Sequence, residues 1–290
     1  MSEATGMEAK MSSSMWLTSV YDDSGRINSL AQIGNSSERG ESNMEYSANI
    51  NGIEVTAFYS DKTVREIFIP LLEHLTELHG EKQRRILVML AAPPGAGKST
   101  LVSFLETRAK DVCPEKRLQA VGMDGFHRRQ EVLVSHTVSV NGREIPMVNI
   151  KGAPVTFDLE GLRRKISELT EGHPCSWPRY DRLLHNPVED AITIEADIVI
   201  LEGNYLLLEL DGWRELSDDA DYTISLSADE ELLRDRLVNR RIATGVEKEA
   251  AEAFVDFSDM ANVRLCLEKT MKADLELEIM PDGSEIRRKR

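Results

Sequence analysis

The sequence predicts an α/β fold in which helices cover both faces of a mostly parallel sheet. Two apolar runs, at residues 86–90 and 196–201, have the composition of strands that are buried on both faces. Segments with apolar residues at three- and four-residue spacing, such as 61–78 and 158–169, predict amphipathic helices that pack beside these strands. Strands that alternate with helices along the chain are typical of an open parallel sheet.

The composition favours a globular protein that acts on small molecules. The chain has 290 residues, 41% of them hydrophobic, which is enough for a substantial core in a single α/β unit. With 35 basic and 50 acidic side chains, its net charge of −15 opposes general attraction to nucleic acid or to anionic lipid. No apolar run in the sequence approaches the length needed to span a bilayer. We therefore expect neither a nucleic-acid nor a membrane partner.

The cysteines and the N-terminus indicate a cytoplasmic protein. Cys113, Cys175 and Cys266 are odd in number, widely separated and without metal-ligand spacing, so we interpret them as reduced thiols. Glu3 and Glu8 stand where a signal peptide would carry basic residues. Eleven serines in residues 1–47, without any sustained period, predict a disordered N-terminal tail, which leaves residues 48–290 as one domain.

The first element with a chemical signature is the segment AAPPGAGKST at residues 91–100, which follows the apolar run 86–90. It matches the P-loop pattern GxxxxGK(S/T) except that Ala92 stands at the first glycine. Gly95 and Gly97 let successive backbone N–H groups curl around a polyphosphate, and the helix that follows directs its N-terminal dipole at the same anion. A chance glycine turn is the alternative. The predicted phosphate-binding residues are Pro94, Gly95, Ala96, Gly97, Lys98, Ser99 and Thr100.

Two acidic residues follow strand candidates and are expected at the same edge of the sheet. Asp124 comes after the short run 117–123, and Glu202 comes after the run 196–201. Ligands of open parallel sheets bind beyond the carboxyl ends of the strands. Asp124 suits a catalytic base there, although an Asp-Gly pair is also common in plain turns. Glu202 resembles the Walker B position, where a carboxylate holds Mg²⁺ directly or through water.

The segment between these two strands predicts a hairpin, a helix and a polar loop. Residues 128–150 contain two alternating runs around Asn141 and Gly142, which favours a hairpin insertion, and Asp158 begins a helix. The two prolines of residues 178–190 exclude a regular helix and predict a loop. That loop could bind a polyhydroxylated or anionic acceptor, or could be ordinary solvated surface, and His185 is a weak candidate for a second base. Its polar side chains are Arg179, Tyr180, Asp181, Arg182 and His185.

The C-terminal third predicts a lid and the end of the sheet. A strand at 222–226 precedes a capping-box pattern at 227–230 and a helix that carries Arg236 and Arg240 four residues apart. Like charges on one helix face suggest a phosphate clamp, with an ion pair to a carboxylate elsewhere in the fold as the alternative. The helix ends at Ala243–Gly245, a suitable hinge. We expect residues 257–262 to begin a helix, 275–279 to form the final strand and 287–290 to be a solvated end.

Five blocks together resemble a known superfamily. The segments APPGAGKST, MDGFH, KGAPVTFD, PRYDRLLHNPVEDAI and ILEGNYLL resemble the P-loop kinases that include phosphoribulokinase, uridine kinase and pantothenate kinase. The resemblance is strongest to the bacterial nucleoside/nucleotide kinase-like group, which includes candidate fructose transport system kinases. It covers about residue 50 to the end, although the hairpin near Asn141 departs from the shorter relatives.

The resemblance implies an ATP-dependent kinase that uses Mg²⁺ and phosphorylates a hydroxyl of a small molecule, with a sugar as the first candidate and a nucleoside or pantothenate-like alcohol next. Asp124, Lys98 and Arg240 would be catalytic, and Ser99 and Glu202 would hold the metal. ATP would also contact Arg236 and Asn262, and a homodimer is compatible with this interpretation. The acceptor would contact Asp124, His127, Arg128, Tyr180, Asp181, Arg182 and Asn204.

Two other classes share the P-loop. A nucleotide-dependent switch or metallochaperone would hydrolyse nucleotide without an acceptor, and an idle binding module would keep the pocket without turnover. Asp124 together with the polar segment 178–190 favours a kinase, because neither rival needs an acceptor site.

Overall fold

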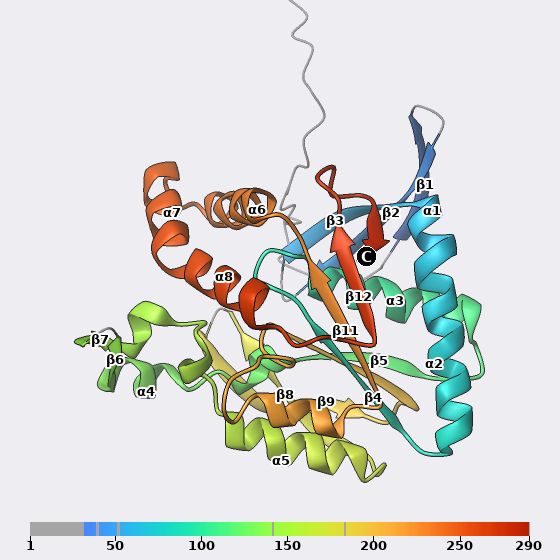
Figure 1. The fold of residues 1–290 in the computed structure, drawn as a ribbon, viewed down its shortest axis with the longest axis horizontal. Helices are drawn as coiled ribbons and strands as arrows, with labels where there is room; N and C mark the ends of the chain where they lie inside the picture. Colours follow the sequence, from blue (N-terminus) through green and yellow to red (C-terminus); the bar gives the residue numbers. More distant parts are fainter. Residues whose placement is uncertain (1–31, 39–40, 51–52, 141, 183, 290) are drawn as a thin grey trace, which may run out of the picture.

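A six-stranded sheet forms the centre of the molecule (Figure 1), in a computed structural model that describes residues 32–38, 41–50, 53–140, 142–182 and 184–289. Five strands are parallel, and the edge strand β13 is antiparallel to its neighbour β12. The runs predicted as buried strands are confirmed as β4 and β10. The sheet order is β13 (Ile286–Arg288), β12 (Leu275–Ile279), β11 (Tyr222–Ser227), β4 (Ile86–Ala91), β10 (Ile198–Gly203) and β5 (Leu118–Gly122).

Helices cover both faces of this sheet, as its buried strands require. Alternate residues of β4 enter two separate cores: Ile86, Val88 and Leu90 pack on one face, and Leu87, Met89 and Ala91 on the other. All six are at most 1% exposed, which is why the strand sequence shows no polar alternation. The first face is covered by α2 (Ile69–Lys82), α3 (Lys98–Val112) and α6 (Glu230–Ala243), and the second by α5 (Leu159–Thr170).

The remaining helices are shorter. The helical turns η2 (Met123–Phe126), η3 (Met147–Ile150), η4 (Pro154–Thr156) and η5 (Arg214–Asp219) are 3₁₀ helices, and η1 (Val64–Phe68) and η6 (Val255–Asp259) are π-helical. The π-helical turn η1 directly precedes α2, in which Pro70 is among the first residues. The short α helices are α1 (Asp61–Thr63), α4 (Gln130–Ser135), α7 (Lys248–Phe254) and α8 (Met260–Lys269).

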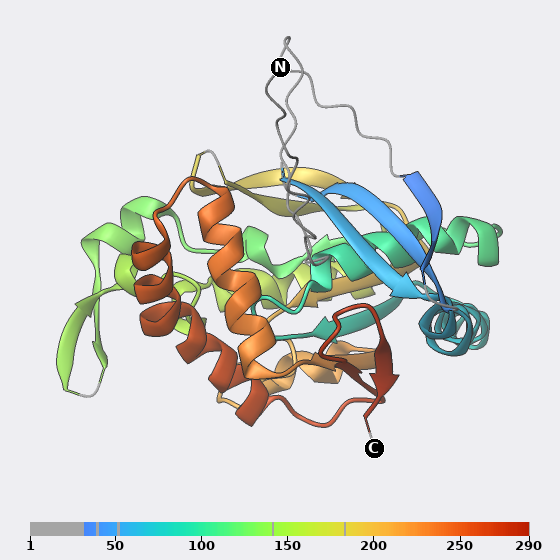
Figure 2. The same cartoon turned by 90° about the horizontal axis from the view of Figure 1, so that it is seen from above.

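An antiparallel sheet of β1 (Gln32–Glu38), β2 (Glu41–Ile50) and β3 (Ile53–Ser60) lies over α3 (Figure 2). Tyr46 of β2 is fully buried, its ring is 5.3 Å from that of Phe104 on α3, and its hydroxyl is 2.7 Å from Ser103 Oγ. The prediction of a tail up to residue 47 is therefore wrong for the described strands. Scattered aromatic residues in a serine-rich segment carry too little periodicity to show that they pack on a distant helix. Residues 1–31 of the predicted tail lie outside the described residues.

Two hairpins lie between β5 and β10 in the chain. The predicted insertion is confirmed as β6 (Thr137–Val140) and β7 (Arg143–Pro146), although Asn141 of its turn is outside the described residues. The predicted polar loop at 178–190 is wrong, because this segment belongs to the antiparallel strands β8 (Cys175–Asp181) and β9 (Asn186–Ile194). Both prolines are compatible with strands here, since Pro178 lies at a register shift and Pro187 pairs with Tyr180 in a two-stranded ribbon.

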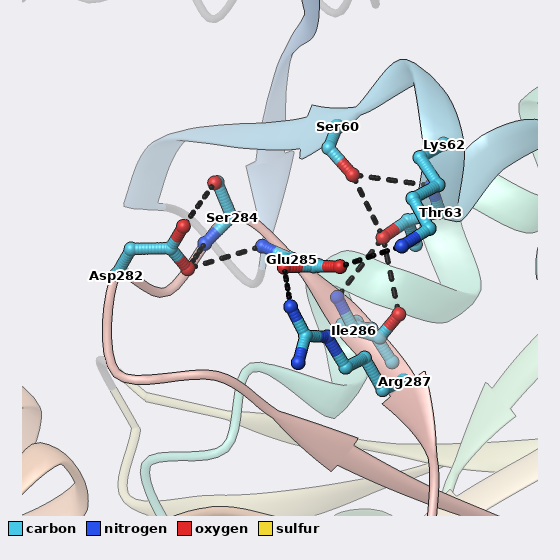
Figure 3. A network of polar contacts seen from close by, with 8 residues as sticks. All are labelled: Ser60, Lys62, Thr63, Asp282, Ser284, Glu285, Ile286 and Arg287. Atoms are coloured by element: carbon cyan, nitrogen blue, oxygen red, sulfur yellow. Dashed lines mark hydrogen bonds and ion pairs between the residues drawn. The ribbon is translucent and has the colours of Figure 1, made fainter. Parts of the chain in front are cut away.

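The C-terminal residues form a turn and a strand that close onto the start of the first helix (Figure 3). The Asp282 carboxylate accepts hydrogen bonds from the backbone N–H groups of Ser284 and Glu285 at 3.1 and 3.2 Å. Thr63 exchanges two hydrogen bonds with the backbone of Ile286, at 3.0 and 3.1 Å. The prediction that 275–279 is the final strand is therefore wrong, because β13 follows it, whereas the predicted solvated end is confirmed for Arg287, Arg288 and Lys289, which are exposed.

Side-chain caps are seen at the first helix and at α6. Ser60 caps the first helix by accepting a hydrogen bond from the Thr63 N–H at 3.1 Å. Asp229, rather than Ser227, caps α6 by accepting from the Glu231 N–H at 2.8 Å. Within the part of the chain that the structure describes, no helix is both long and apolar enough to cross a membrane.

Candidate active site

The ends of three neighbouring strands bring the predicted phosphate loop and both carboxylates to one edge of the sheet. In the register of the sheet, Gly203 of β10 lies beside Ala91 of β4, and Glu202 lies beside Gly122 of β5. Because β4, β10 and β5 are parallel, the segments that leave their carboxyl ends emerge together. The sheet order therefore explains how residues 91–100, Asp124 and Glu202 converge.

The phosphate loop has the backbone shape that its glycines predict. Gly95 and Gly97 have φ angles of +85° and +81°, and Gly97 is the N-cap of α3. Ala92 needs no such freedom, because its N–H continues the β4 pairing by donating to the Gly203 carbonyl at 3.3 Å and its side chain is buried in the core. The departure at Ala92 therefore leaves the loop intact. Around this loop Ala96 and Thr100 are buried, whereas Pro94 is half-buried.

The two residues that follow Gly97 face the Glu202 carboxylate. The Ser99 hydroxyl donates to Glu202 Oε1 at 2.6 Å, and Lys98 Nζ lies 4.0 Å from Glu202 Oε2. Burial raises the pKa of Glu202, the Lys98 charge lowers it, and the net direction is upward. A hydroxyl and a carboxylate oxygen side by side are hard ligands that suit Mg²⁺, which usually binds one or two protein oxygens together with substrate phosphates. The residues present thus fit a magnesium ion.

Asp124 lies in the 3₁₀ turn η2 and faces positive groups from four elements. Its side chain is 43% exposed, and its Oδ1 lies 4.0 Å from His127 Nε2. Burial of the carboxyl group raises its pKa, but His127 in its protonated form and the charges of Lys98, Arg182 and Arg240 outweigh this effect and lower the pKa below its usual value. Asp124 is therefore held as a carboxylate that solvent or a ligand can reach.

His127 is fixed by rings on two sides. It stacks on Phe157 with a centroid distance of 4.0 Å and meets Tyr180 edge-on at 5.1 Å. Burial lowers its pKa more than the Asp124 carboxylate raises it, so the ring is neutral near pH 7. Its Nδ1 is buried and has no hydrogen-bond partner among the described residues. The ring nitrogen that faces Asp124 is the other one, Nε2.

The β8–β9 hairpin is fixed directly over η2 by a close backbone approach. A Cβ on Gly125 would lie 2.2 Å from the Pro178 carbonyl oxygen, and the buried indole of Trp177 donates to the Gly122 carbonyl at 2.9 Å. These contacts bring Tyr180 beside His127 and place the Arg182 charge close enough to lower the pKa of Asp124. The Asp181 carboxylate instead accepts from the Leu184 N–H at 2.9 Å and shapes the hairpin turn.

Some of the predicted acceptor residues are used differently. Arg128 is exposed and donates from Nε to the Val155 carbonyl at 3.3 Å, so this contact ties it to the neighbouring loop. Arg179 is exposed, as is His185, which contributes a backbone carbonyl to a hydrogen bond with Lys151 at 3.2 Å. Asn204, which follows β10, keeps a buried Oδ1 without a partner among the described residues.

The two arginines predicted as a clamp on α6 diverge. Arg240 is influenced by Arg182, Asp259 and Asp124, and burial is the main reason that its pKa is lowered. The Arg236 guanidinium lies 3.5 Å from the carbonyl oxygen of Ala96, in the phosphate loop, and 3.5 Å from that of Gly283. Arg240 thus acts on Asp124, whereas Arg236 contacts the phosphate loop itself, and the interpretation of the two arginines as a phosphate clamp stays a prediction.

The helices η6 and α8 pack against α6, which carries Arg240. Arg241, beside Arg240, forms an ion pair with Asp259 at 3.0 Å, which connects α6 to η6. Asn262, predicted near the adenine, is 7% exposed, and its amide nitrogen is 3.6 Å from the position a Cβ on Gly152 would take. Gly152 in turn accepts from the Tyr205 hydroxyl at 2.6 Å.

Lys151 is a site residue that the sequence reasoning missed. Its Nζ donates to Gln130 Oε1 at 2.9 Å and lies 5.0 Å from the centroid of the Tyr180 ring. Its charge also lowers the pKa of His127. The signal that could have found it is the block KGAPVTFD, in which Lys151 directly precedes the glycine that meets Tyr205 and Asn262.

Fold and site define the class: this is a P-loop protein whose phosphate loop shares one sheet edge with two carboxylates. Residues 87–284 match the model of the Phosphoribulokinase / Uridine kinase family, and the chain belongs to this family. The members matched here are kinases that phosphorylate hydroxyl groups. The chain is thus an ATP-dependent phosphotransferase with an alcohol group of a small molecule as acceptor.

Individual relatives agree with this assignment. The uncharacterized protein YggC of Escherichia coli strain K12 is 38% identical over 83% of this chain and 98% of its own length. A candidate uridine kinase of Schizosaccharomyces pombe is 30% identical over 68% of this chain and 84% of its own. The crystal structure of a candidate fructose transport system kinase from Silicibacter sp. TM1040 has a TM-score of 0.65, with 32% identity over 72% of this chain and 98% of that one.

Proposed function

We propose that this kinase transfers the γ-phosphoryl group of ATP to a hydroxyl of a sugar, with Asp124 as the general base. The observation that carries the proposal is the environment of Asp124, a solvent-accessible carboxylate with a lowered pKa beside Lys98, Arg182 and Arg240. A base that stays ionised among cations can accept a proton from a hydroxyl while those cations neutralise the transferred group. A sugar is favoured because a similar structure belongs to a candidate fructose transport system kinase.

In this proposal the acceptor oxygen forms a bond to the γ-phosphorus, the bond between that phosphorus and the β–γ bridging oxygen breaks, and the hydroxyl proton passes to Asp124. ADP is the other product. Lys98 and Arg240 lie where they can stabilise charge on the phosphoryl oxygens, and the phosphate-loop N–H groups hold the β-phosphate. Ser99 and Glu202 would hold Mg²⁺, which neutralises phosphate charge when bound.

The experiment is ADP release measured against sugars, nucleosides and pantothenate, because relatives in this family include candidate uridine kinases and pantothenate kinases. We expect one acceptor to raise ADP release well above the rate with water. Asp124→Asn should lower kcat about 10²- to 10⁴-fold, as for loss of a general base, with little change in KM for ATP. Lys98→Ala should lower kcat about 10²- to 10³-fold.

Asp256→Asn is the matched control, because Asp256 pairs with Arg234 on the exposed side of the lid and should leave turnover unchanged. If no acceptor raises ADP release, the transferase proposal is wrong and a nucleotide-hydrolysing switch or metallochaperone becomes the better interpretation. If Asp124→Asn keeps full activity, Asp124 is not the base.

A further inference from the structure

The phosphate loop packs against α6. A Cβ on Gly95 would lie 3.0 Å from the backbone carbonyl oxygen of Leu233 and 3.1 Å from the Leu237 side chain. Next to this contact, Arg236 Nη1 donates a hydrogen bond to the Ala96 carbonyl at 3.5 Å. When the N–H groups of such a loop converge on an anion, its carbonyl groups need partners elsewhere, because a buried carbonyl without a partner costs stability. Arg236 supplies one of these partners.

Arg236 bonds to backbone carbonyls rather than to an acidic side chain. Within the part of the chain that the structure describes, no carboxylate opposes the effect of burial, which lowers the pKa of Arg236, and its Nε is buried without a hydrogen-bond partner. Its Nη2 donates to the Gly283 carbonyl at 3.5 Å. The guanidinium therefore joins two backbone carbonyls, one in the phosphate loop and one in the turn before β13. A planar fork of N–H groups suits this role.

Gly283 allows this approach because it lacks a side chain. Its φ angle is +76°, in the left-handed region that favours glycine. A Cβ at this position would lie 2.8 Å from Arg236 Nη2, well inside the separation of about 3.5–4.0 Å at which non-bonded carbon atoms pack. Any other residue would therefore push the guanidinium away and weaken its hold on Ala96.

The turn that carries Gly283 is fixed to the start of the first helix (Figure 3). The Ser284 carbonyl accepts a hydrogen bond from the Ser60 N–H at 3.1 Å. Thr63 Oγ1 accepts from the Ile286 N–H at 3.0 Å and donates to the Ile286 carbonyl at 3.1 Å. Thr63 and Ile286 are 1% and 4% exposed, so water does not compete for these hydrogen bonds. The position of Gly283 is therefore set by buried contacts outside the candidate active site.

We propose that Arg236 is a positioning residue for the phosphate loop, and that the C-terminal turn, residues 280–285, holds it in place. Gly283 fixes the guanidinium, the guanidinium fixes the Ala96 carbonyl, and the N–H groups of the loop are then oriented toward a polyphosphate before it binds. Preorganisation of this kind lowers the cost of binding. The inference goes beyond the proposed function, since it concerns the binding of polyphosphate and does not depend on which hydroxyl is phosphorylated.

The test measures the binding of tripolyphosphate and of ATP by calorimetry. Tripolyphosphate has no base or ribose, so its affinity reports on the phosphate site alone. Gly283→Ala should raise the dissociation constants of tripolyphosphate and ATP by a similar factor, about three- to tenfold, the usual effect of losing one hydrogen bond. In the ligand-free protein, hydrogen exchange of residues 91–100 should become faster, because the loop has lost its support.

Gly172→Ala is the matched control. Gly172 lies between α5 and β8, its φ angle is +82°, and an added Cβ would meet nothing within 4 Å. Because both variants place alanine at a positive φ, backbone strain alone should affect the two equally in urea denaturation. Gly172→Ala should leave both affinities and the hydrogen exchange of the loop unchanged.

Arg236→Met separates positioning from a direct contact between Arg236 and a bound phosphate. If Arg236 positions the loop, this variant should speed hydrogen exchange of residues 91–100 without any ligand, and adding Gly283→Ala should weaken tripolyphosphate binding no further. Arg236→Lys should restore little of the affinity, because an ammonium joins two carbonyls less well than a planar fork does. A direct phosphate contact predicts unchanged exchange in the free protein and partial rescue by lysine.

Tripolyphosphate binding at the wild-type level in Gly283→Ala, or an equal loss in Gly172→Ala, would overturn the inference. The same holds for loop exchange that stays unchanged in Arg236→Met, and for a loss confined to ATP, which would mean that the turn contacts the nucleoside part instead. Each of these results leaves the kinase proposal intact. A wild-type protein that binds neither ATP nor tripolyphosphate would contradict the proposed function as well.

Discussion

The proposed ATP half and the proposed acceptor half of the site are built by different means. The ATP half lies at the edge of the central sheet. The phosphate loop follows β4, and Glu202 of the neighbouring strand β10 lies beside it. The acceptor half is assembled from η2, the loop at 151–153 and the β8–β9 hairpin, none of which belongs to that sheet. The first half depends on strand order, and the second on a few contacts between segments far apart in the chain.

This difference predicts where the site is fragile. Hydrogen bonds along the full lengths of β4 and β10 hold the ATP half in place. A single substitution there should therefore remove a functional group without moving the neighbouring side chains. The acceptor half depends on point contacts such as the one between Gly125 and Pro178 and the hydrogen bond from Trp177 to Gly122. Substitutions at these contacts should displace the whole hairpin and leave the nucleotide site unchanged.

Gly125→Ala should produce the largest separation of the two halves. The new Cβ would lie 2.2 Å from the Pro178 carbonyl oxygen, so the hairpin and its Tyr180 and Arg182 must move away from Asp124. A shift of about 1 Å in a positioned group costs about a hundredfold in rate. We expect kcat/KM for the acceptor to fall by about that factor, with KM for ATP changed less than about threefold in steady-state assays.

Gly80→Ala is the matched control for this substitution. Gly80 lies in α2, its added Cβ would meet nothing within 4 Å, and alanine in a helix should raise the free energy of unfolding by about 0.5–1 kcal/mol. Activity should stay unchanged. Equal losses of acceptor and ATP affinity in Gly125→Ala would show that the two halves are not separable.

A smaller effect is expected in the pH dependence of the reaction. The pKa of Asp124 lies below its usual value because cations outweigh the effect of its protein surroundings, so activity should fall only as the pH drops through that lowered pKa. Arg182→Gln removes one of these cations. The pKa of Asp124 should rise, and the acid limb of kcat/KM should move to higher pH. An acid limb that stays in place would show that Arg182 does not act on the base.

The same division explains what could be predicted from the sequence. The P-loop pattern and the strand ends at Asp124 and Glu202 are local signals, and they led to the correct sheet edge. The β8–β9 hairpin was mistaken for a loop because its prolines lie at a register shift and in a two-stranded ribbon, positions that only pairing reveals. Lys151 was missed because its partners, Gln130, Tyr180 and His185, come together through tertiary contacts.

Local patterns also left the partners of Arg236 unknown and misplaced the N-terminal boundary. Spacing on a helix shows that Arg236 and Arg240 share a face, but it does not show that Arg236 contacts the Ala96 and Gly283 carbonyls while Arg240 acts on Asp124. A serine-rich sequence also does not show that the ring of Tyr46 packs against the buried ring of Phe104. In both cases the partners lie more than forty residues away in the chain.

The smallest effect is expected for a substitution in the N-terminal sheet, which in the described part of the chain contacts the phosphate-loop helix but not the acceptor half. The Tyr46 hydroxyl lies 2.7 Å from Ser103 Oγ on the phosphate-loop helix. Tyr46→Phe removes this hydrogen bond and should lower the free energy of unfolding by about 1 kcal/mol, measured by urea denaturation. Because α3 is also held by the central core, kcat and both KM values should stay unchanged. Changed kinetics with unchanged stability would mean that β2 positions the ATP half, which would then depend on tertiary contacts as the acceptor half does.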